Sequence, residues 1–299
     1  MGVKIALTGG LGFLGRHVLA QLRARGCDVV LLGRSRPAEA GKATDGDWRA
    51  VDLLDTPHLQ AALRGLGASH LLHLAWYTEH GRYWSSSENL RWVDASLQLL
   101  QAFAAQGGQH ALLAGSCAEY DWSHGWLREA TTPLQPASLY GVAKDATRRL
   151  AQAWCQAQGL GLAWAHVFYP FGPGEGERRL LPSLLRVFAG QAAPFGVNAS
   201  AYRGLLPVQE AASALVHLLL TGQQGRYNIC SGQPVPMGDV VRLLAHLCDA
   251  DPEPVLQLAT ARPDEPPVLV GDPRRLHATG WLPSLTLQQG LEQLLAQPL

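Results

Sequence analysis

The sequence lacks three features that would indicate particular classes of protein: paired cysteines, an excess of one charge, and a long apolar run. Its five cysteines are scattered and form no C-x-x-C pair, which argues against a disulfide framework or a zinc site. Lysine plus arginine number 24, as do aspartate plus glutamate, so we expect no basic face for nucleic acid or a membrane surface. No apolar run approaches the length of a membrane span, and we expect no signal peptide. These absences predict a cytoplasmic protein that holds no metal.

The most informative stretch is a glycine-rich turn between an apolar strand and a helix. Residues 3–8 are apolar and β-branched, glycines recur over 9–15, and helical spacing and a second strand follow over 17–33. In such a βαβ unit the glycines allow a tight turn, the close approach of a pyrophosphate, and close packing of the helix on the strand. The helix N-terminus offers N–H groups to the phosphates. We therefore predict a dinucleotide site, rather than an ordinary turn, at Gly9, Gly12, Phe13, Leu14 and Gly15.

The residues after the second expected strand indicate which dinucleotide binds. NAD-binding units usually place an acid there, which holds the ribose hydroxyls. This chain has Gly33 followed by Arg34 and Ser35, and a guanidinium binds a 2′-phosphate that a carboxylate would repel. We predict NADP(H) at Arg34 and Ser35, with NAD as the other candidate cofactor; the alternative is an ordinary surface loop. Asp52 and Leu53, at the end of a third expected strand over 48–52, are predicted at the adenine edge, although an Asp before a helix capped near Thr56 explains Asp52 equally well.

The first half of the chain alternates strands with helices. We expect strands over 69–75, 111–115 and 160–168, and helices over 88–105 and 138–157. This alternation predicts an α/β fold with a Rossmann-type, doubly wound parallel sheet. His70 and His73 are expected to be satisfied structural residues. Residues 76–87 form a long aromatic loop at the carboxyl end of a strand, where ligands bind in such sheets. Its rings are expected either to stack on a sugar or base, or to pack as a flap.

The pattern changes after residue 168, where a glycine- and proline-rich loop covers 169–176. The later stretches predict helices over 181–190, 208–220, 237–248, 272–279 and 287–295, extended segments over 202–207 and 226–230, a short strand over 255–258, and a proline-rich loop over 260–270. We predict that residues 1–168 form the NADP-binding Rossmann domain, to which residues 204–230 return. Residues 169–203 and 231–299 are expected to form a smaller α/β domain that binds the substrate.

Three side chains are candidates for a hydride-transfer site. Ser116 ends an expected strand, and Tyr140 and Lys144 are four residues apart on one helix, hence on one face. A phenol has a reference pKa near ~10, which a lysine ammonium and an oxidised nicotinamide nearby would both lower. Tyr140 would exchange a proton with a carbonyl or alcohol oxygen, Ser116 would hydrogen-bond that oxygen, and Lys144 would also hold the nicotinamide ribose. The Y-x-x-x-K spacing alone is commonplace, but its place behind the glycine turn favours the catalytic interpretation.

Together these motifs resemble the extended short-chain dehydrogenases/reductases, and more narrowly their NAD(P)-dependent nucleotide-sugar epimerase, dehydratase and reductase branch. The similarity continues through residues 171–174, 203–210, 227–232, 262–264 and 280–283, so it spans nearly the whole chain. The resemblance implies further cofactor contacts at Leu74, Ala75, Trp76 and Phe168. It implies substrate contacts at Arg203, Arg262, Tyr169 and Leu181, with the two arginines on the diphosphate of a nucleoside-diphosphate sugar. It also implies a homodimer formed through the helices over 88–105 and 138–157.

The chain departs from the family pattern at several positions. The family often has Arg and Asn where this chain has His166 and Tyr169, and Asn where it has Trp92. Its dehydratases carry acids after the strand-end Ser or Thr, where this chain has Cys117 and Ala118. We therefore expect NADPH-dependent reduction of a nucleoside-diphosphate 4-keto-6-deoxy sugar to the 6-deoxy sugar. A nucleotide-sugar 4-epimerase that retains NAD(P) is the main alternative, and a non-catalytic NADP-binding regulator is a weaker one.

Overall fold

The computed structural model describes residues 3–34, 48–262 and 265–296, and the chain divides into two compact units. The first unit comprises Met1–Tyr120, Pro133–His166 and Ala212–Tyr227, and the second comprises Asp121–Thr132, Val167–Ala211 and Asn228–Leu299. Within the segment over 204–230, residues 212–227 belong to the first unit, whereas residues 204–211 and 228–230 belong to the second. Among the described helices, none is long and apolar enough to cross a membrane.

The first unit is built on a seven-stranded sheet with the strand order β11-β7-β5-β4-β1-β2-β3. Its strands are β1 (Lys4–Thr8), β2 (Asp28–Gly33), β3 (Trp48–Ala50), β4 (His70–His73), β5 (His110–Ser116), β7 (Gly161–Val167) and β11 (Gly225–Ile229). β1 pairs in parallel with β2 on one side and β4 on the other, and β2–β3 and β4–β5 are also parallel. The predicted doubly wound parallel sheet is confirmed.

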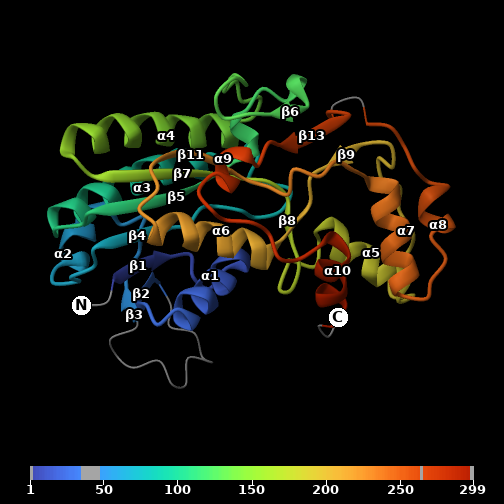
Figure 1. The fold of residues 1–299 in the computed structure, drawn as a ribbon, viewed down its shortest axis with the longest axis horizontal. Helices are drawn as coiled ribbons and strands as arrows, with labels where there is room; N and C mark the ends of the chain where they lie inside the picture. Colours follow the sequence, from blue (N-terminus) through green and yellow to red (C-terminus); the bar gives the residue numbers. More distant parts are fainter. Residues whose placement is uncertain (1–2, 35–47, 263–264, 297–299) are drawn as a thin grey trace. The chain divides into compact units, whose positions relative to one another are not determined.

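Helices cover both faces of this sheet. They are α1 (Phe13–Ala24), α2 (Leu59–Leu63), α3 (Glu88–Ala105), α4 (Leu139–Gln158) and α6 (Val208–Leu220). Leu99 and Phe103 of α3 pack with Leu71 and Leu113 of the strands in one buried cluster, which also takes in α2 and α4. α1 and α6 lie on the other face (Figure 1). Strands buried on both faces need apolar side chains throughout, which explains the near-continuous apolar runs in the sequence.

The second unit contains two small sheets and a separate apolar core. Its sheets have the orders β10-β8 and β12-β9-β13-β6. The strands are β6 (Trp126–Leu127), β8 (Pro170–Phe171), β9 (Tyr202–Arg203), β10 (Leu206–Pro207), β12 (Val235–Pro236) and β13 (Val268–Gly271). The helices are α5 (Leu180–Phe188), α7 (Met237–Leu247), α8 (Glu253–Leu256), α9 (Arg274–His277) and α10 (Leu287–Leu295). Leu184 and Leu185 of α5, Val240 and Val241 of α7, and Leu291 of α10 form its core.

Two expectations for the second unit are wrong. The strand expected over 255–258 is instead the end of helix α8, because Pro252 precedes the first turn and the Asp251 carboxylate accepts the Glu253 N–H at 3.0 Å. Both are helix-start signals that outweigh a short apolar run. The proline-rich loop expected over 260–270 contains most of β13, which pairs with β9 and β6. Its apolar residues 268–270 gain ladder partners that the local sequence does not reveal.

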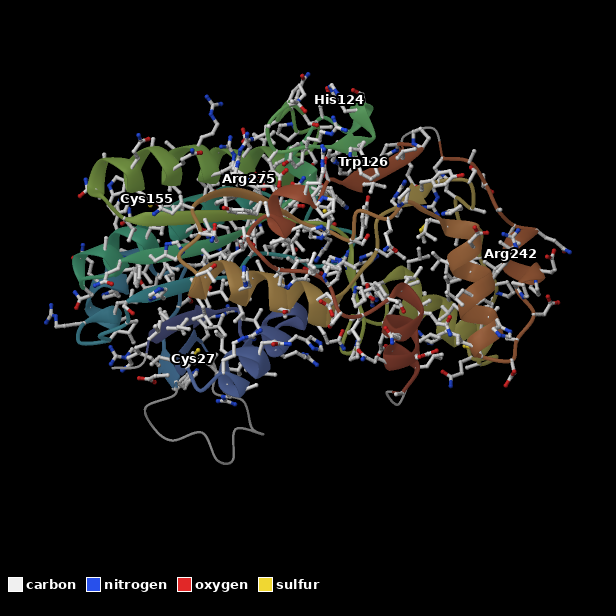
Figure 2. All side chains as sticks on the ribbon, in the orientation of Figure 1. Cys27, His124, Trp126, Cys155, Arg242 and Arg275 are labelled. Carbon is white, nitrogen blue, oxygen red and sulfur yellow. The ribbon has the colours of Figure 1, made fainter. Side chains whose placement is uncertain are left out.

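All five cysteines are free thiols. Within the first unit, Cys27 follows α1 and Cys155 lies on α4, well apart from each other (Figure 2). Over the part of the chain that the structure describes, no cluster of three or more histidine, cysteine, aspartate or glutamate side chains could hold a metal ion.

Two histidines face each other at the amino-terminal ends of β4 and β5. His70 and His110 are register partners, and their ring centroids lie 5.7 Å apart in a T-shaped arrangement. The His110 ring is buried, and its Nε2 has no hydrogen-bond partner among the described residues. Burial and the neighbouring His70 lower the pKa of His110 from 6.5 to about 4. The native state therefore holds His110 neutral, and acid must destabilise it.

This pair generates a test of pH-dependent stability. Between pH 6.5 and about pH 4 the unfolded chain binds a proton on His110 that the folded chain does not, so the free energy of unfolding falls as the pH falls. A His110→Phe variant lacks this loss. Between pH 7.5 and pH 5 its free energy of unfolding should fall by about 2 kcal/mol less than that of the parent. Urea unfolding at both pH values measures the free energy of unfolding, and His124→Phe, at an exposed position, is the control. If the parent and His110→Phe lose the same free energy of unfolding, His110 is not the group responsible.

Candidate active site

The glycine turn after β1 has the geometry that the sequence predicts. Gly9 has a φ of 69°, a left-handed conformation that favours glycine. The Gly12 N–H closes the turn on the Gly9 carbonyl at 3.0 Å, and α1 starts at the next residue. A Cβ on Gly15 would collide with the Gly9 carbonyl oxygen, so close packing of helix on strand requires glycine there. The N–H groups of Phe13 and Leu14 lie in the first helical turn, where no intrahelical acceptor is available.

A chain of hydrogen bonds ties the ends of β1 and β4 to α3. The Thr8 hydroxyl lies 2.7 Å from His73 Nδ1, and His73 Nε2 lies 2.9 Å from the Ser96 hydroxyl. The Ser96 hydroxyl donates its hydrogen to the Trp92 carbonyl, so its oxygen must accept from His73. The His73 ring therefore carries its proton on Nε2. Thr8 Oγ1 in turn accepts the N–H groups of Leu74 and Ala75 at 3.2 and 3.3 Å. The predicted structural role of His73 is confirmed: burial lowers its pKa to about 3, so it stays neutral.

Ser116 ends β5 and begins a short 3₁₀ turn over Cys117–Glu119. Its side-chain oxygen accepts the Ala118 N–H at 3.1 Å, and its own N–H donates to Glu119 Oε1 at 2.7 Å. This reciprocal capping box satisfies the backbone groups left over where the strand ends, and it holds the Ser116 hydroxyl at the carboxyl edge of the sheet.

Tyr140 lies in the first turn of α4, which Ser138 caps by accepting the Gly141 N–H at 3.1 Å. Aromatic rings of the loop over 76–87 enclose the phenol: Trp76, Tyr83 and Trp84 have ring centroids 6.5, 5.0 and 5.7 Å from that of Tyr140. The Tyr140 N–H also donates to the Trp84 carbonyl at 3.1 Å. These rings therefore pack as a flap, which was one of the two expectations for this loop.

The electrostatic setting of Tyr140 keeps its proton in place. Burial raises the pKa of Tyr140 above its usual value, and a hydrogen bond with Ser116 acts in the lowering direction. A phenol in this setting is protonated at neutral pH and is ready to donate.

Lys144 is one turn further along α4 and is almost completely buried. Its Nζ donates to the Ala114 carbonyl at 2.8 Å and lies 3.8 Å from the centre of the Trp76 ring. Burial lowers the pKa of Lys144 to about 7, while the negative charge of Glu119 acts in the raising direction. The indole face compensates for part of the lost hydration, because a desolvated cation–π contact stabilises an ammonium by about 2 kcal/mol. The structure thus brings Ser116, Tyr140 and Lys144 together in the first unit.

Glu119 is the residue of this site that the sequence analysis missed. It is completely buried, and besides Ser116 it contacts Trp164 Nε1 at 3.0 Å and His166 Nε2 at 3.2 Å. The sequence gives one signal for Glu119: its carboxylate comes three residues after a buried apolar strand. A carboxylate buried at that place needs hydrogen-bond donors around it.

The predicted contacts of the adenosine end are spread over the ends of β2 and β3. Arg34 directly follows β2 and is exposed, whereas Ser35 lies outside the described residues. The Asp52 carboxylate accepts the Leu54 N–H at 3.0 Å in a local turn, and the short helical turn over Thr56–His58 begins after Asp55. The Leu53 side chain is buried in the core of the first unit, so only its backbone is available to a ligand.

In the second unit, one carboxylate joins the two predicted diphosphate-binding arginines. Glu265 lies 3.5 Å from Arg203 Nη2 through Oε2 and 3.0 Å from Arg262 Nη1 through Oε1. Arg203 is mostly buried and also donates to the carbonyls of Tyr202 and Pro266, each at 2.9 Å. Two guanidinium groups that share one acid form a concentrated positive site, which suits an anion with several oxygens.

The other predicted contacts of the second unit differ in exposure. Tyr169 has a φ of 39°, an unusual conformation for a residue with a side chain, and its ring lies 5.9 Å from the Arg203 guanidinium carbon. Such strained residues cluster at ligand sites. The side chains of Phe168 and Leu181 are buried in the unit, so any ligand contact they make is through the backbone.

The comparison with protein families agrees with this geometry. A model of the NAD dependent epimerase/dehydratase family matches residues 5–230. The chain belongs to this family. It is 28% identical over 312 residues to the GDP-6-deoxy-D-mannose reductase of Pseudomonas aeruginosa, with 99% of this chain and 97% of that protein covered. It is 25% identical to the UDP-glucose 4-epimerase of Streptomyces lividans, with 95% and 92% covered. The solved structure of RMD from Pseudomonas aeruginosa complexed with NADPH superposes with a TM-score of 0.76, at 26% identity and with 98% of both chains covered.

The family assignment confirms the resemblance that the motifs indicated. The chain is a nucleotide-sugar short-chain dehydrogenase/reductase of the epimerase, dehydratase and reductase branch, and its cofactor is of the NAD(P) type.

Proposed function

We propose that this enzyme reduces a nucleoside-diphosphate 4-keto-6-deoxy sugar to the 6-deoxy sugar with NADPH. The observation that carries the proposal is the gathering of Ser116, Tyr140 and Lys144 in a chain that resembles a GDP-6-deoxy-D-mannose reductase along its whole length. The reaction class follows from these groups: a proton donor, a hydrogen-bond donor for the same oxygen, and a neighbouring ammonium.

NADPH, when bound, supplies the hydride that adds to the keto carbon. Tyr140 donates its proton to the keto oxygen, so the carbonyl becomes an alcohol and the phenol a phenolate. Ser116 donates a hydrogen bond to the same oxygen, and the Lys144 ammonium stabilises the phenolate. The glycine turn and the N-terminus of α1 hold the pyrophosphate of the cofactor, and Leu74, Ala75 and Trp76 follow β4 at the same edge of the sheet.

The strand end after β5 argues against a dehydratase. Removing water from a sugar needs an acid and a base besides the tyrosine, and positions 117 and 118 hold a cysteine and an alanine. The acid at position 119 does not replace them, because its carboxylate accepts the N–H groups of Ser116 and Trp164 within the protein.

A 4-epimerase that retains its cofactor is the second candidate function, supported by the 25% identity to a UDP-glucose 4-epimerase. An epimerase needs the same three side chains, because it oxidises and then reduces one sugar carbon. A non-catalytic regulator is weaker, since it would not need a buried lysine beside a buried tyrosine.

For the substrate, we propose that Arg203 and Arg262 bind the diphosphate, with Tyr169 and the backbone of Leu181 beside it. Arginine forks match the oxygens of a diphosphate, and the shared acid Glu265 keeps the two guanidinium groups oriented before the ligand arrives.

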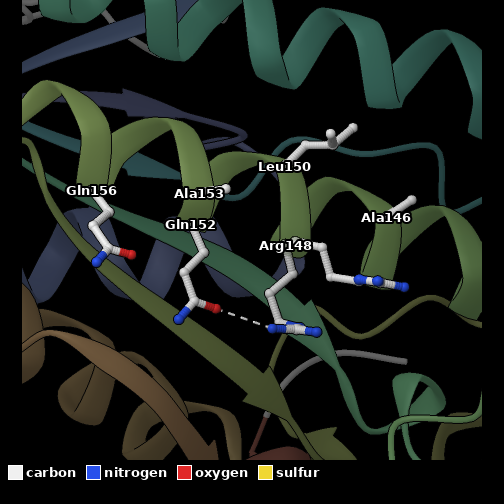
Figure 3. Close-up of a pocket in the computed structure, with 7 residues that line it drawn as sticks. Ala146, Arg148, Leu150, Gln152, Ala153 and Gln156 are labelled. Atoms are coloured by element: carbon white, nitrogen blue, oxygen red, sulfur yellow. Dashed lines mark hydrogen bonds between the residues drawn. The ribbon is translucent and has the colours of Figure 1, made fainter.

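For the oligomer, we propose a homodimer formed through α3 and α4. Leu90 of α3 and Val142 and Leu150 of α4 are apolar yet exposed by 59%, 48% and 53%. Figure 3 shows Leu150 and Ala146 on α4, and residues 142, 146 and 150 recur every four positions on one helix face.

Sedimentation velocity should give a dimer for the parent and a monomer for Leu150→Glu. The control Leu282→Glu, at an exposed leucine outside these helices, should remain dimeric; a monomeric parent contradicts the proposal.

The cofactor proposal predicts a loss that is selective for one dinucleotide. Arg34→Ala should weaken NADPH binding by about 1–3 kcal/mol, the size of a charged hydrogen bond, and leave NADH binding almost unchanged. Fluorescence titration of both cofactors measures the difference. Arg64→Ala, at another exposed arginine of the first unit, should affect neither; equal losses for NADPH and NADH in Arg34→Ala would show that no 2′-phosphate lies at Arg34.

The reaction itself is tested by mixing the protein with NADPH and a panel of nucleoside-diphosphate 4-keto-6-deoxyhexoses. We expect stoichiometric loss of NADPH absorbance and a single 6-deoxy product by NMR.

Tyr140→Phe keeps the ring among its aromatic neighbours, so folding and NADPH binding should persist while turnover falls by about 10² or more. Arg203→Ala and Arg262→Ala should raise KM for the sugar and not for NADPH.

Two results would contradict the proposed reductase function or the role of Tyr140 in it. If no keto sugar drives NADPH oxidation, yet a nucleotide hexose is inverted at C4 without added cofactor, the enzyme is an epimerase. If Tyr140→Phe turns over at the parental rate, another group supplies the proton.

A further inference from the structure

Behind Ser116 lies a carboxylate that the proposed chemistry does not use. Glu119 has no exposed surface, and its two oxygens accept N–H groups from Ser116, Trp164 and His166 at 2.7 to 3.2 Å. The backbone is shaped around it, because a Cβ on Gly115 would collide with both the Trp164 ring and the Glu119 carboxylate. A buried carboxylate costs several kcal/mol of hydration unless such partners compensate. A purely structural turn could have been closed at lower cost by a neutral side chain.

We propose that Glu119 is a positioning residue of the active site, which fixes Ser116 through its backbone N–H and places a carboxylate near Tyr140 and Lys144. This inference rests on the proposed function, because it assigns a role in the same reaction. Glu119 does not touch the reacting atoms, so it acts only through the groups that do.

Glu119 lies among several charged and titratable groups of the first unit. Arg148 of α4 lies 3.8 Å from Glu119 and pairs with Asp145 at 2.6 Å, so two carboxylates share one guanidinium. The Lys144 ammonium, also on α4, supplies a second positive charge. From β4, His73 faces Lys144 but remains neutral, and from β7, His166 links Glu119 to the Tyr120 hydroxyl, which lies 3.0 Å from its Nδ1.

The carboxylate of Glu119 affects how firmly Lys144 holds its proton. Burial lowers the pKa of Lys144 to about 7, and Glu119 is the group that opposes the fall. Without that charge, Lys144 would lose its proton at lower pH and could no longer stabilise the phenolate of Tyr140. The alkaline limb of the rate profile should therefore depend on Glu119.

The variant Glu119→Gln separates charge from shape. Its amide oxygen can still accept the N–H groups of Ser116 and Trp164, and its NH₂ can donate to His166 if that ring moves its proton to Nδ1. The control is Glu129→Gln, which removes another buried carboxylate, this one from the second unit, where Glu129 accepts the Asn228 N–H at 2.8 Å.

Lys144 can be observed without any assay of activity, because the chain has only three lysines: Lys4, Lys42 and Lys144. With lysine labelled at Nζ with ¹⁵N, an NMR titration follows each of them. We expect the pKa of Lys144 to fall by about one unit in Glu119→Gln and to stay at the parental value in Glu129→Gln. The alkaline limb of kcat should move by the same amount. A pKa of Lys144 that is unchanged in Glu119→Gln overturns the charge role.

The shorter variant Glu119→Asp tests the positioning role and remains informative if the Gln variant fails to fold. It keeps the charge but not the reach to the Ser116 N–H. We expect the pKa of Lys144 to stay close to the parental value, KM for NADPH to be unchanged, and kcat to fall about tenfold or more. Parental kcat in Glu119→Asp overturns the positioning role. If the parent itself reduces no keto sugar, the proposed function fails, whereas the NMR titration still decides the charge role.

Discussion

The candidate active site depends on keeping ionisable groups out of water at the carboxyl ends of β4 and β5. A lysine and a tyrosine so deeply buried are each pushed toward the neutral form, and the pKa of Lys144 falls to about 7 as a result. The surrounding protein must replace the lost hydration. It does so with the Ala114 carbonyl, the face of Trp76 and the carboxylate of Glu119. Each of these comes from a different element, so the chemistry requires the sheet and its helices to be assembled first.

Most of the fold could be predicted from the sequence, and so could the gathering of Ser116, Tyr140 and Lys144 in one place. The glycine turn needs φ > 0 at Gly9 and an open backbone at Gly15, and only glycine meets both needs, so the pattern in the sequence is specific. Tyr140 and Lys144 share a helix face by their spacing alone, and Ser116 follows from the end of a buried strand. These features depend on local geometry and periodicity, which a sequence states directly.

The features that escaped prediction depend on contacts between distant residues. Nothing in the order of the residues shows that Glu119 meets Trp164 and His166, which lie 45 and 47 positions away. Nor does the sequence show that the rings of Tyr83 and Trp84 pack against Tyr140. In the second unit, β13 exists because β9 and β6 lie on either side of it, not because its own residues demand a strand.

The aromatic loop over 76–87 is fastened at several points. The Asn89 side chain accepts the Trp76 N–H and donates to the Tyr83 and Ser86 carbonyls, while the Tyr140 N–H holds the Trp84 carbonyl. Its conformational entropy is therefore lost when the chain folds, not when a ligand arrives. Many enzymes spend microseconds to milliseconds closing a loop over their substrate, and opening it again often limits turnover. Here hydrogen bonds within the fold already hold the wall beside the phenol, so we expect this part of the site to add little ordering penalty to the affinity for a ligand.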